Sequence, residues 1–98
     1  EEGNKILLGN DELTVIEAPG HSPGHICFYC AAQHFIISGD VLFKRSIGRT
    51  DLPGGNHETL LKNIREKLFT LPGETKVYSG HGPVTTIGEE KNQNPFFN

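Results

Sequence analysis

Three apolar, strand-like runs in this 98-residue chain end in a turn that contains glycine, and a metal-binding residue type follows each turn directly. The three residues are His21, Asp40 and His81, and the runs before them are 13–18, 35–38 and 76–79. Open sheets bind ligands beyond the C-terminal ends of their strands. Imidazole together with carboxylate is a ligand set for zinc, iron or manganese. If the three runs share a sheet and a direction, the two imidazoles and the carboxylate therefore converge on one edge.

The rest of the chain follows an α/β pattern of about five or six short strands and two helices. The predicted elements are a strand pair 5–8 and 13–16, a strand pair 26–31 and 35–38, a strand ending at Tyr78, a long loop over 41–56, a helix from Asn56 or His57 to about Phe69, and a last helix capped by Thr85 or Thr86. A loop of that length is typical of ligand binding. Two helices are expected to cover only one face of such a sheet, so the chain is predicted to be half of a layered domain.

Charge and composition exclude several classes of partner. The net charge is −3 and no basic run is longer than Lys44-Arg45, so a nucleic-acid surface is not expected. No apolar stretch approaches the roughly 20 residues of a membrane span. Cys27 and Cys30 lie three apart in a predicted strand, so their side chains point to opposite faces and are expected to pack rather than to share a bond or a metal. Two cysteines without a disulfide framework predict a cytoplasmic protein.

The residues around the three strand ends resemble the metallo-β-lactamase superfamily. The matching motifs are Pro-Gly-His-Ser-Pro-Gly-His at 19–25, Gly-Asp-Val-Leu-Phe at 39–43 and Ser-Gly-His-Gly-Pro at 79–83, in the order of that family. Residues 46–55 and 85–96 resemble in particular the single-domain, glyoxalase II-like (hydroxyacylglutathione hydrolase-like) enzymes of bacteria. The resemblance implies the C-terminal half of an αβ/βα sandwich, with residues 1–98 as a single partial domain. The family's Thr-His-x-His-x-Asp-His signature, which belongs to the N-terminal half, does not occur in these 98 residues.

The resemblance also implies a dinuclear metal site. His21 corresponds to a ligand of one metal and His81 to a ligand of the other, and Asp40 corresponds to the catalytic carboxylate that bridges them. The family's metal is usually zinc, with iron or manganese as alternatives, and its usual chemistry is hydrolysis of a thioester such as an S-acyl glutathione by a metal-bound hydroxide. Three ligands spread over two metals predict that this chain alone binds metal weakly, is metal-free or nearly so, and hydrolyses little.

Three further residues are candidates for the surroundings of the site. His25 is expected to make a hydrogen bond behind the ligands rather than to bind metal. Arg49 and Lys44 are candidates for binding a substrate carboxylate. The alternative for Arg49 is an ion pair with Asp51 that organises the loop, and the alternative for Lys44 is a solvated surface charge.

Two other functions remain open from the sequence. A persulfide dioxygenase-like enzyme with one iron carries a similar Gly-Arg-Thr-Asp loop, here residues 48–51, but its loop continues with Phe-Gln, whereas this one continues with Leu52-Pro53. The second alternative is a non-catalytic half-domain whose bare sheet face pairs with a second copy to form a homodimer.

Overall fold

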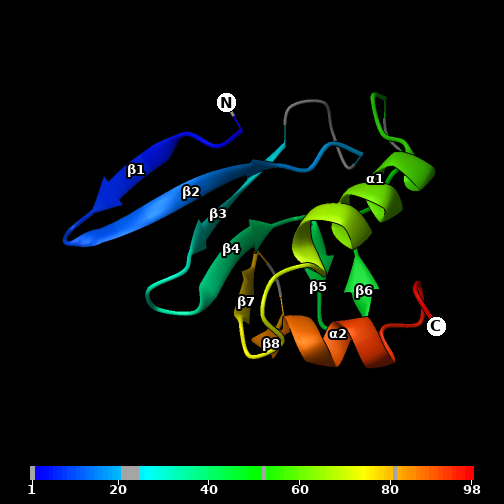
Figure 1. The fold of residues 1–98 in the computed structure, drawn as a ribbon. Helices are drawn as coiled ribbons and strands as arrows, with labels where there is room; N and C mark the ends of the chain where they lie inside the picture. The colour runs from blue at the N-terminus through cyan, green and yellow to red at the C-terminus, as the bar shows by residue number, and fades with distance from the viewer. Residues whose placement is uncertain (1, 21–24, 52, 81) are drawn as a thin grey trace.

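The computed structural model of the chain describes residues 2–20, 25–51, 53–80 and 82–98. It is an α/β fold built on a six-stranded mixed sheet in the order β1-β2-β3-β4-β7-β8. The strands are β1 (Lys5–Leu8), β2 (Asp11–Glu17), β3 (Ile26–Cys30), β4 (Phe35–Gly39), β7 (Lys76–Ser79) and β8 (Thr85–Thr86). Figure 1 shows the hairpin of β1 and β2 projecting away from the helices.

The three strands that precede the candidate ligands point the same way. Strand β2 pairs antiparallel with β3, and β3 pairs antiparallel with β4, so β2 and β4 run in one direction. Strand β7 pairs parallel with β4. The three strands therefore share one sheet and one direction, which is the condition that the sequence argument set, and the C-terminal ends of β2, β4 and β7 lie at the same edge.

A short hairpin occupies the start of the segment predicted as a long loop. Strands β5 (Leu42–Phe43) and β6 (Ser46–Ile47) pair antiparallel across a turn at Lys44 and Arg45, where Arg45 has a φ of 61°. The prediction of an unstructured loop from residue 41 was wrong for these six residues. Leu42 and Ile47 are buried, and this burial fixes the hairpin against the body of the chain.

The two predicted helices are present with the predicted caps. Helix α1 (His57–Asn63) begins at Asn56, whose Oδ1 accepts a hydrogen bond from Thr59 N at 2.9 Å, and a π-helical turn, η1 (Ile64–Leu68), continues it. Helix α2 (Ile87–Gln93) begins at Thr86, whose Oγ1 accepts from Glu89 N at 3.1 Å. No helix in the described ranges has the length and apolar character that crossing a membrane requires.

The hydrophobic core lies between the helices and one face of the six-stranded sheet. Its fully buried members include Cys27, Ile36 and Val77 from the sheet and Leu60, Ile64, Leu68 and Ile87 from the helices. Side chains alternate along a strand, so the residues between these sheet positions point to the other face. The helical stripe predicted from the sequence therefore packs on the sheet as expected.

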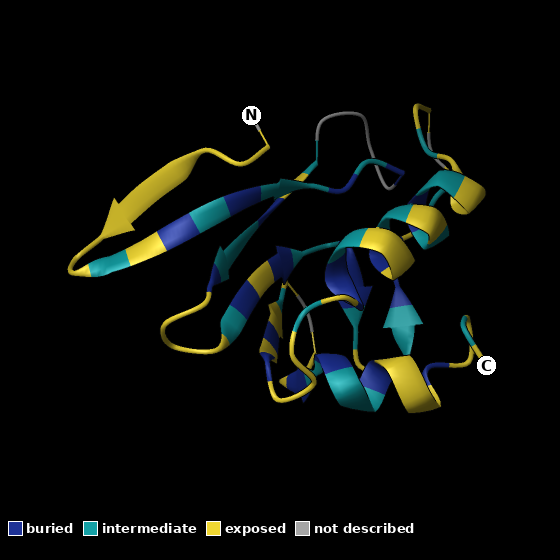
Figure 2. Cartoon of the chain, in the orientation of Figure 1, coloured by how far each residue is buried: buried dark blue, intermediate teal, exposed yellow. Residues whose placement is uncertain are grey.

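The opposite face of the sheet is apolar and only partly covered in the described residues. Phe28, Ile37 and Tyr78 pair in register across β3, β4 and β7 on this face. Ile37 is 38% exposed and Tyr78 is 40% exposed. Strand β1 is exposed along its whole length, as Figure 2 shows. The helices thus cover one face of the sheet, as predicted.

Candidate metal site

The ends of β4 and β7 are joined by a backbone hydrogen bond. The parallel register runs from Ile37 opposite Tyr78 to Gly39 opposite Ser79, with an irregularity between Ile37 and Gly39. Gly80 N then donates to Gly39 O at 2.7 Å. The turn that follows β4 therefore lies directly beside the residue that follows β7.

Asp40 sits in a tight turn at this edge. Val41 N donates to Ser38 O at 3.0 Å, and Gly39 has a φ of 55°, a conformation that favours glycine. The buried Ser38 hydroxyl donates to Leu42 O at 2.9 Å and ties the turn to β5. Asp40 is half-buried, and its Oδ1 lies against Gly80. The carboxylate predicted as a ligand is thus held at the strand end.

The end of β2 is anchored to helix α1 at the same edge. Gly20 O accepts a hydrogen bond from Asn56 N at 2.6 Å, so the residue before His21 in the sequence is fixed to the start of α1. His21 itself and His81 lie outside the described residues. Their assignment as metal ligands stays a prediction.

His25 lies beside the Asp40 turn. Its Nε2 is 3.4 Å from Ser38 O, and a side chain on Gly39 would come within 3.2 Å of that nitrogen. Within the described residues, no group of three or more His, Cys, Asp or Glu side chains gathers as a metal site. The Asp40 carboxylate, at the C-terminal end of β4, is suited to bind a metal ion. The described residues alone do not supply a full set of metal ligands.

Arg49 and Asp51 form an ion pair on the loop that follows β6. Arg49 Nε is 2.9 Å from Asp51 Oδ1, and Nη2 is 3.2 Å from Oδ2. The hydrogen bond from Arg49 lowers the pKa of Asp51, and the same bond raises the pKa of Arg49. Gly48 N donates to Val41 O at 3.0 Å, which places this loop next to the residue after Asp40. The sequence left an ion pair between Arg49 and Asp51 as one of two alternatives for Arg49, and this ion pair is confirmed.

A shallow hollow of about 340 Å³ opens beside this ion pair. Its lining includes Arg49, Thr50, Asp51, His57 and Phe96. His57 and Phe96 come from the start of α1 and from the C-terminal tail, and their ring centroids are 6.2 Å apart. A small molecule bound here would contact both the Arg49 loop and the helix that anchors the end of β2.

Lys44 and Arg45 in the β5–β6 turn point toward α2. Lys44 Nζ is 3.9 Å from a carboxylate oxygen of Glu89. Arg45 binds the fully buried Glu90 twice, from its backbone N at 2.6 Å and from Nη1 at 2.7 Å. Thr85 Oγ1 and Asn94 Nδ2 also donate to Glu90. Sequence reasoning missed this buried network, because a glutamate near the start of an exposed helix normally faces water.

The two cysteines pack in the interior. Both are buried and neither forms a disulfide. Burial raises the pKa of Cys27 to about 12, so its thiol stays protonated at neutral pH. The predicted packing role is confirmed.

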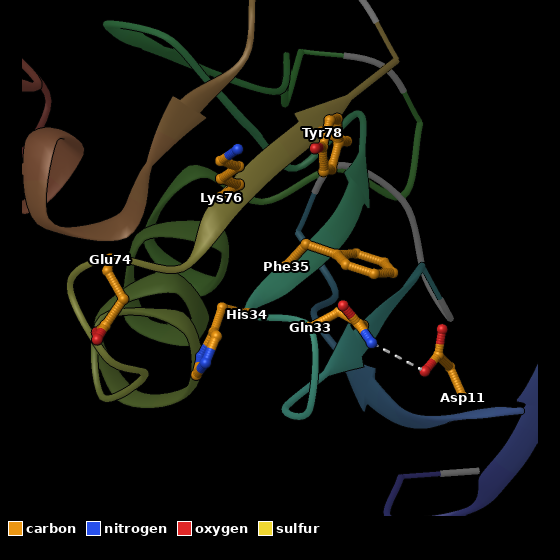
Figure 3. A pocket seen from close by; sticks show the side chains of 7 residues that line it. All are labelled: Asp11, Gln33, His34, Phe35, Glu74, Lys76 and Tyr78. Atoms are coloured by element: carbon orange, nitrogen blue, oxygen red, sulfur yellow. Dashed lines mark hydrogen bonds between the residues drawn. The ribbon is translucent and has the colours of Figure 1, made fainter.

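A larger hollow of about 590 Å³ lies at the opposite end of β4 and β7 (Figure 3). Its lining residues are Asp11, Gln33, His34, Phe35, Glu74, Lys76 and Tyr78. Gln33 Nε2 donates to Asp11 Oδ1 at 3.3 Å across its rim. Phe35 and Lys76 start the strands that Asp40 and Gly80 follow, so this hollow is separate from the candidate metal site.

Comparison with known proteins agrees with the strand-end geometry. Residues 1–81 match the family model described as the metallo-beta-lactamase superfamily. The chain belongs to the metallo-β-lactamase superfamily. It is 52% identical to the "Probable metallo-hydrolase YqgX" of Bacillus subtilis, and the match covers 100% of this chain and 46% of that protein. It is 45% identical to the hydroxyacylglutathione hydrolase GloC of Haemophilus influenzae, with the same coverage of each chain.

Solved members of the superfamily share the fold. The crystal structure of TTHA1623 in a di-iron-bound form has a TM-score of 0.88 and 47% identity, and covers 98% of this chain and 46% of that one. ETHE1 from Myxococcus xanthus has a TM-score of 0.90 and 37% identity, covering 97% and 43%. The chain thus spans less than half the length of these metallo-β-lactamase relatives. Its membership of the superfamily rests on the part of their length that it matches.

Proposed function

We propose that the intact protein is a metal-dependent hydrolase that cleaves a small thioester of the S-acyl glutathione kind. The observation that carries the proposal is the Asp40 carboxylate held at the shared edge of β2, β4 and β7. The 45% identity to the hydroxyacylglutathione hydrolase of Haemophilus influenzae supports the substrate class. Zinc is the proposed metal, and the di-iron form of TTHA1623 supports iron as the alternative.

In this proposal His21, Asp40 and His81 would hold two metal ions, with Asp40 as the ligand that both would share. Bound metal would lower the pKa of a water molecule and polarise the acyl carbonyl. His25 supports the site from behind, because its ring nitrogen reaches Ser38 O in the turn that carries Asp40.

Arg49 and Lys44 are proposed to bind a carboxylate of the substrate. Arg49 is 63% exposed although it is paired with Asp51, so a ligand carboxylate can compete with Asp51 for the guanidinium from the solvent side. Lys44 is also exposed, and its 3.9 Å distance to Glu89 is at the long end for an ion pair. The hollow beside Arg49 has room for a small ligand.

The test is Asp40→Ala in the intact protein, with Asp11→Ala as the matched control. Asp11 lies in β2 at the far end of the sheet, so its removal changes the same charge without touching the site. We expect Asp40→Ala to lose bound metal and turnover of an S-acyl glutathione thioester, while Asp11→Ala keeps both. Unchanged turnover in Asp40→Ala would end the proposal.

The alternative enzyme is a persulfide dioxygenase-like protein with a single iron. The Gly48-Arg49-Thr50-Asp51 loop supports it, and the Leu52-Pro53 continuation favours the hydrolase. Metal analysis together with oxygen consumption on a persulfide substrate separates the two. One iron per chain with oxygen uptake would favour the dioxygenase.

A further inference from the structure

The carboxylate of Asp40 occupies space that a side chain on Gly80 would need. A Cβ built on Gly80 would lie 2.9 Å from Asp40 Oδ1 and 3.6 Å from the carbonyl carbon and oxygen of Gly39. Nonbonded heavy atoms have their optimal separation near 3.5–4.0 Å. A methyl group at position 80 and the present Asp40 carboxylate therefore cannot coexist.

The backbone around this contact is fixed on both sides. Gly80 N donates to Gly39 O at 2.7 Å, and His25 Nε2 approaches Ser38 O on the other side of the turn. The turn is also closed by the hydrogen bond from Val41 N to Ser38 O at 3.0 Å. Because these peptide groups are held by hydrogen bonds, a methyl group on Gly80 is expected to displace the Asp40 carboxylate.

The conformation of Gly80 does not itself require glycine. The glycines with positive φ in the described residues are Gly3, Gly9, Gly20, Gly39, Gly54 and Gly82. Gly80 is not among them, so at this position the missing side chain matters rather than a positive φ.

We propose that Gly80 is a positioning residue for Asp40, whose carboxylate it keeps turned toward the metal site by having no side chain. The metal-directed part of this inference rests on the proposed function. A carboxylate ligand must be held within about 0.5 Å of its productive place, and rotation about χ1 moves its oxygens farther than that. Gly80→Ala should therefore change metal binding while the fold is retained.

The experiment uses the intact protein, labelled with ¹³C and ¹⁵N and stripped of metal, and three variants. Three-bond couplings from N and from the carbonyl carbon to Cγ report the χ1 angle of Asp40 without any metal. Paramagnetic shifts of amide signals during a Co²⁺ titration report binding even when it is weak. The variants are Gly80→Ala, Asp40→Ala and the control Gly73→Ala, whose added Cβ would lie at an ordinary 3.6 Å from Gly88 Cα.

We expect Gly80→Ala to change the Asp40 couplings and to weaken Co²⁺ binding by about tenfold or more, the range measured for residues that orient metal ligands. Gly73→Ala should match the parent in both readouts. Unchanged Asp40 couplings in Gly80→Ala would refute the positioning role and leave the proposed function standing. If Asp40→Ala bound Co²⁺ as well as the parent, the metal role of Asp40 would fail, and with it both proposals.

Discussion

Removal of the Arg45 side chain should destabilise the fold far more than removal of Arg49. Arg45 Nη1 contacts the Glu90 carboxylate at 2.7 Å, and Glu90 is fully buried. Arg45 is itself 35% exposed, so the pair is sheltered on one side only. The variant Arg45→Ala leaves a buried carboxylate without its opposite charge.

The magnitude follows from the donors that remain. Breaking a buried ion pair by removing one partner costs about 3–5 kcal/mol. Here the backbone N of residue 45, Thr85 Oγ1 and Asn94 Nδ2 still donate to Glu90, which lowers the penalty. Loss of the charge-assisted hydrogen bond then costs about 2–3 kcal/mol. For a domain of this size that corresponds to a fall in Tm of roughly 10–20 °C.

Arg49→Ala is the matched control because Arg49 makes a bond of similar length, 2.9 Å, to a carboxylate in solvent. Arg49 is 63% exposed and Asp51 is 70% exposed. Exposed pairs contribute little to stability. Thermal and urea unfolding of both variants, followed by far-ultraviolet circular dichroism, should shift the transition for Arg45→Ala and leave it in place for Arg49→Ala. Equal shifts in the two variants would refute the argument that burial decides the effect.

Three further outcomes are expected. Gly20→Ala should unfold the chain or lower its Tm strongly, since an added Cβ would lie 2.5 Å from the backbone of Leu60 and the φ of Gly20 is 133°; an unchanged melting curve would contradict the packing. Cys27 should resist thiol reagents at pH 8 until the chain is denatured, and rapid labelling of the native chain would show that the thiol is accessible. Because the pKa of Cys27 is raised from 9.0 to about 12 in the folded chain, the stability of the fold should fall as pH rises from 9 toward 12. The chain should sediment as a homodimer in which a second copy covers the face of Ile37 and Tyr78, and Tyr78→Lys should shift it toward monomer; a well-folded monomer of the parent at high micromolar concentration would refute the pairing.

The sequence predicted the elements whose pattern repeats over several residues. The strand runs before Asp40 and His81 alternate or are continuously apolar, and the stripe on α1 follows the helical period, so both were visible without a structure. The common direction of β2, β4 and β7 was only a condition of the sequence argument, because strand direction depends on pairings between segments that are distant in the sequence.

The missed features depend on contacts between distant residues or on very short elements. Strands β5 and β6 have two residues each, too few to show an alternating pattern. The partner of Arg45 is 45 positions away, and a glutamate in a helix gives no signal that it is buried. The close approach of Gly80 to Asp40 was equally hidden, since a glycine before a turn residue is usually there for its backbone freedom.

The central claim is that the edge formed by β4 and β7 is a metal site with Asp40 as a ligand. Anomalous diffraction from a crystal of the intact, zinc-soaked protein, collected on both sides of the zinc absorption edge, tests it most directly. The account predicts anomalous density within coordination distance of an Asp40 carboxylate oxygen, about 2.0–2.2 Å. Fully occupied zinc elsewhere in the molecule, with none beside Asp40, would contradict it.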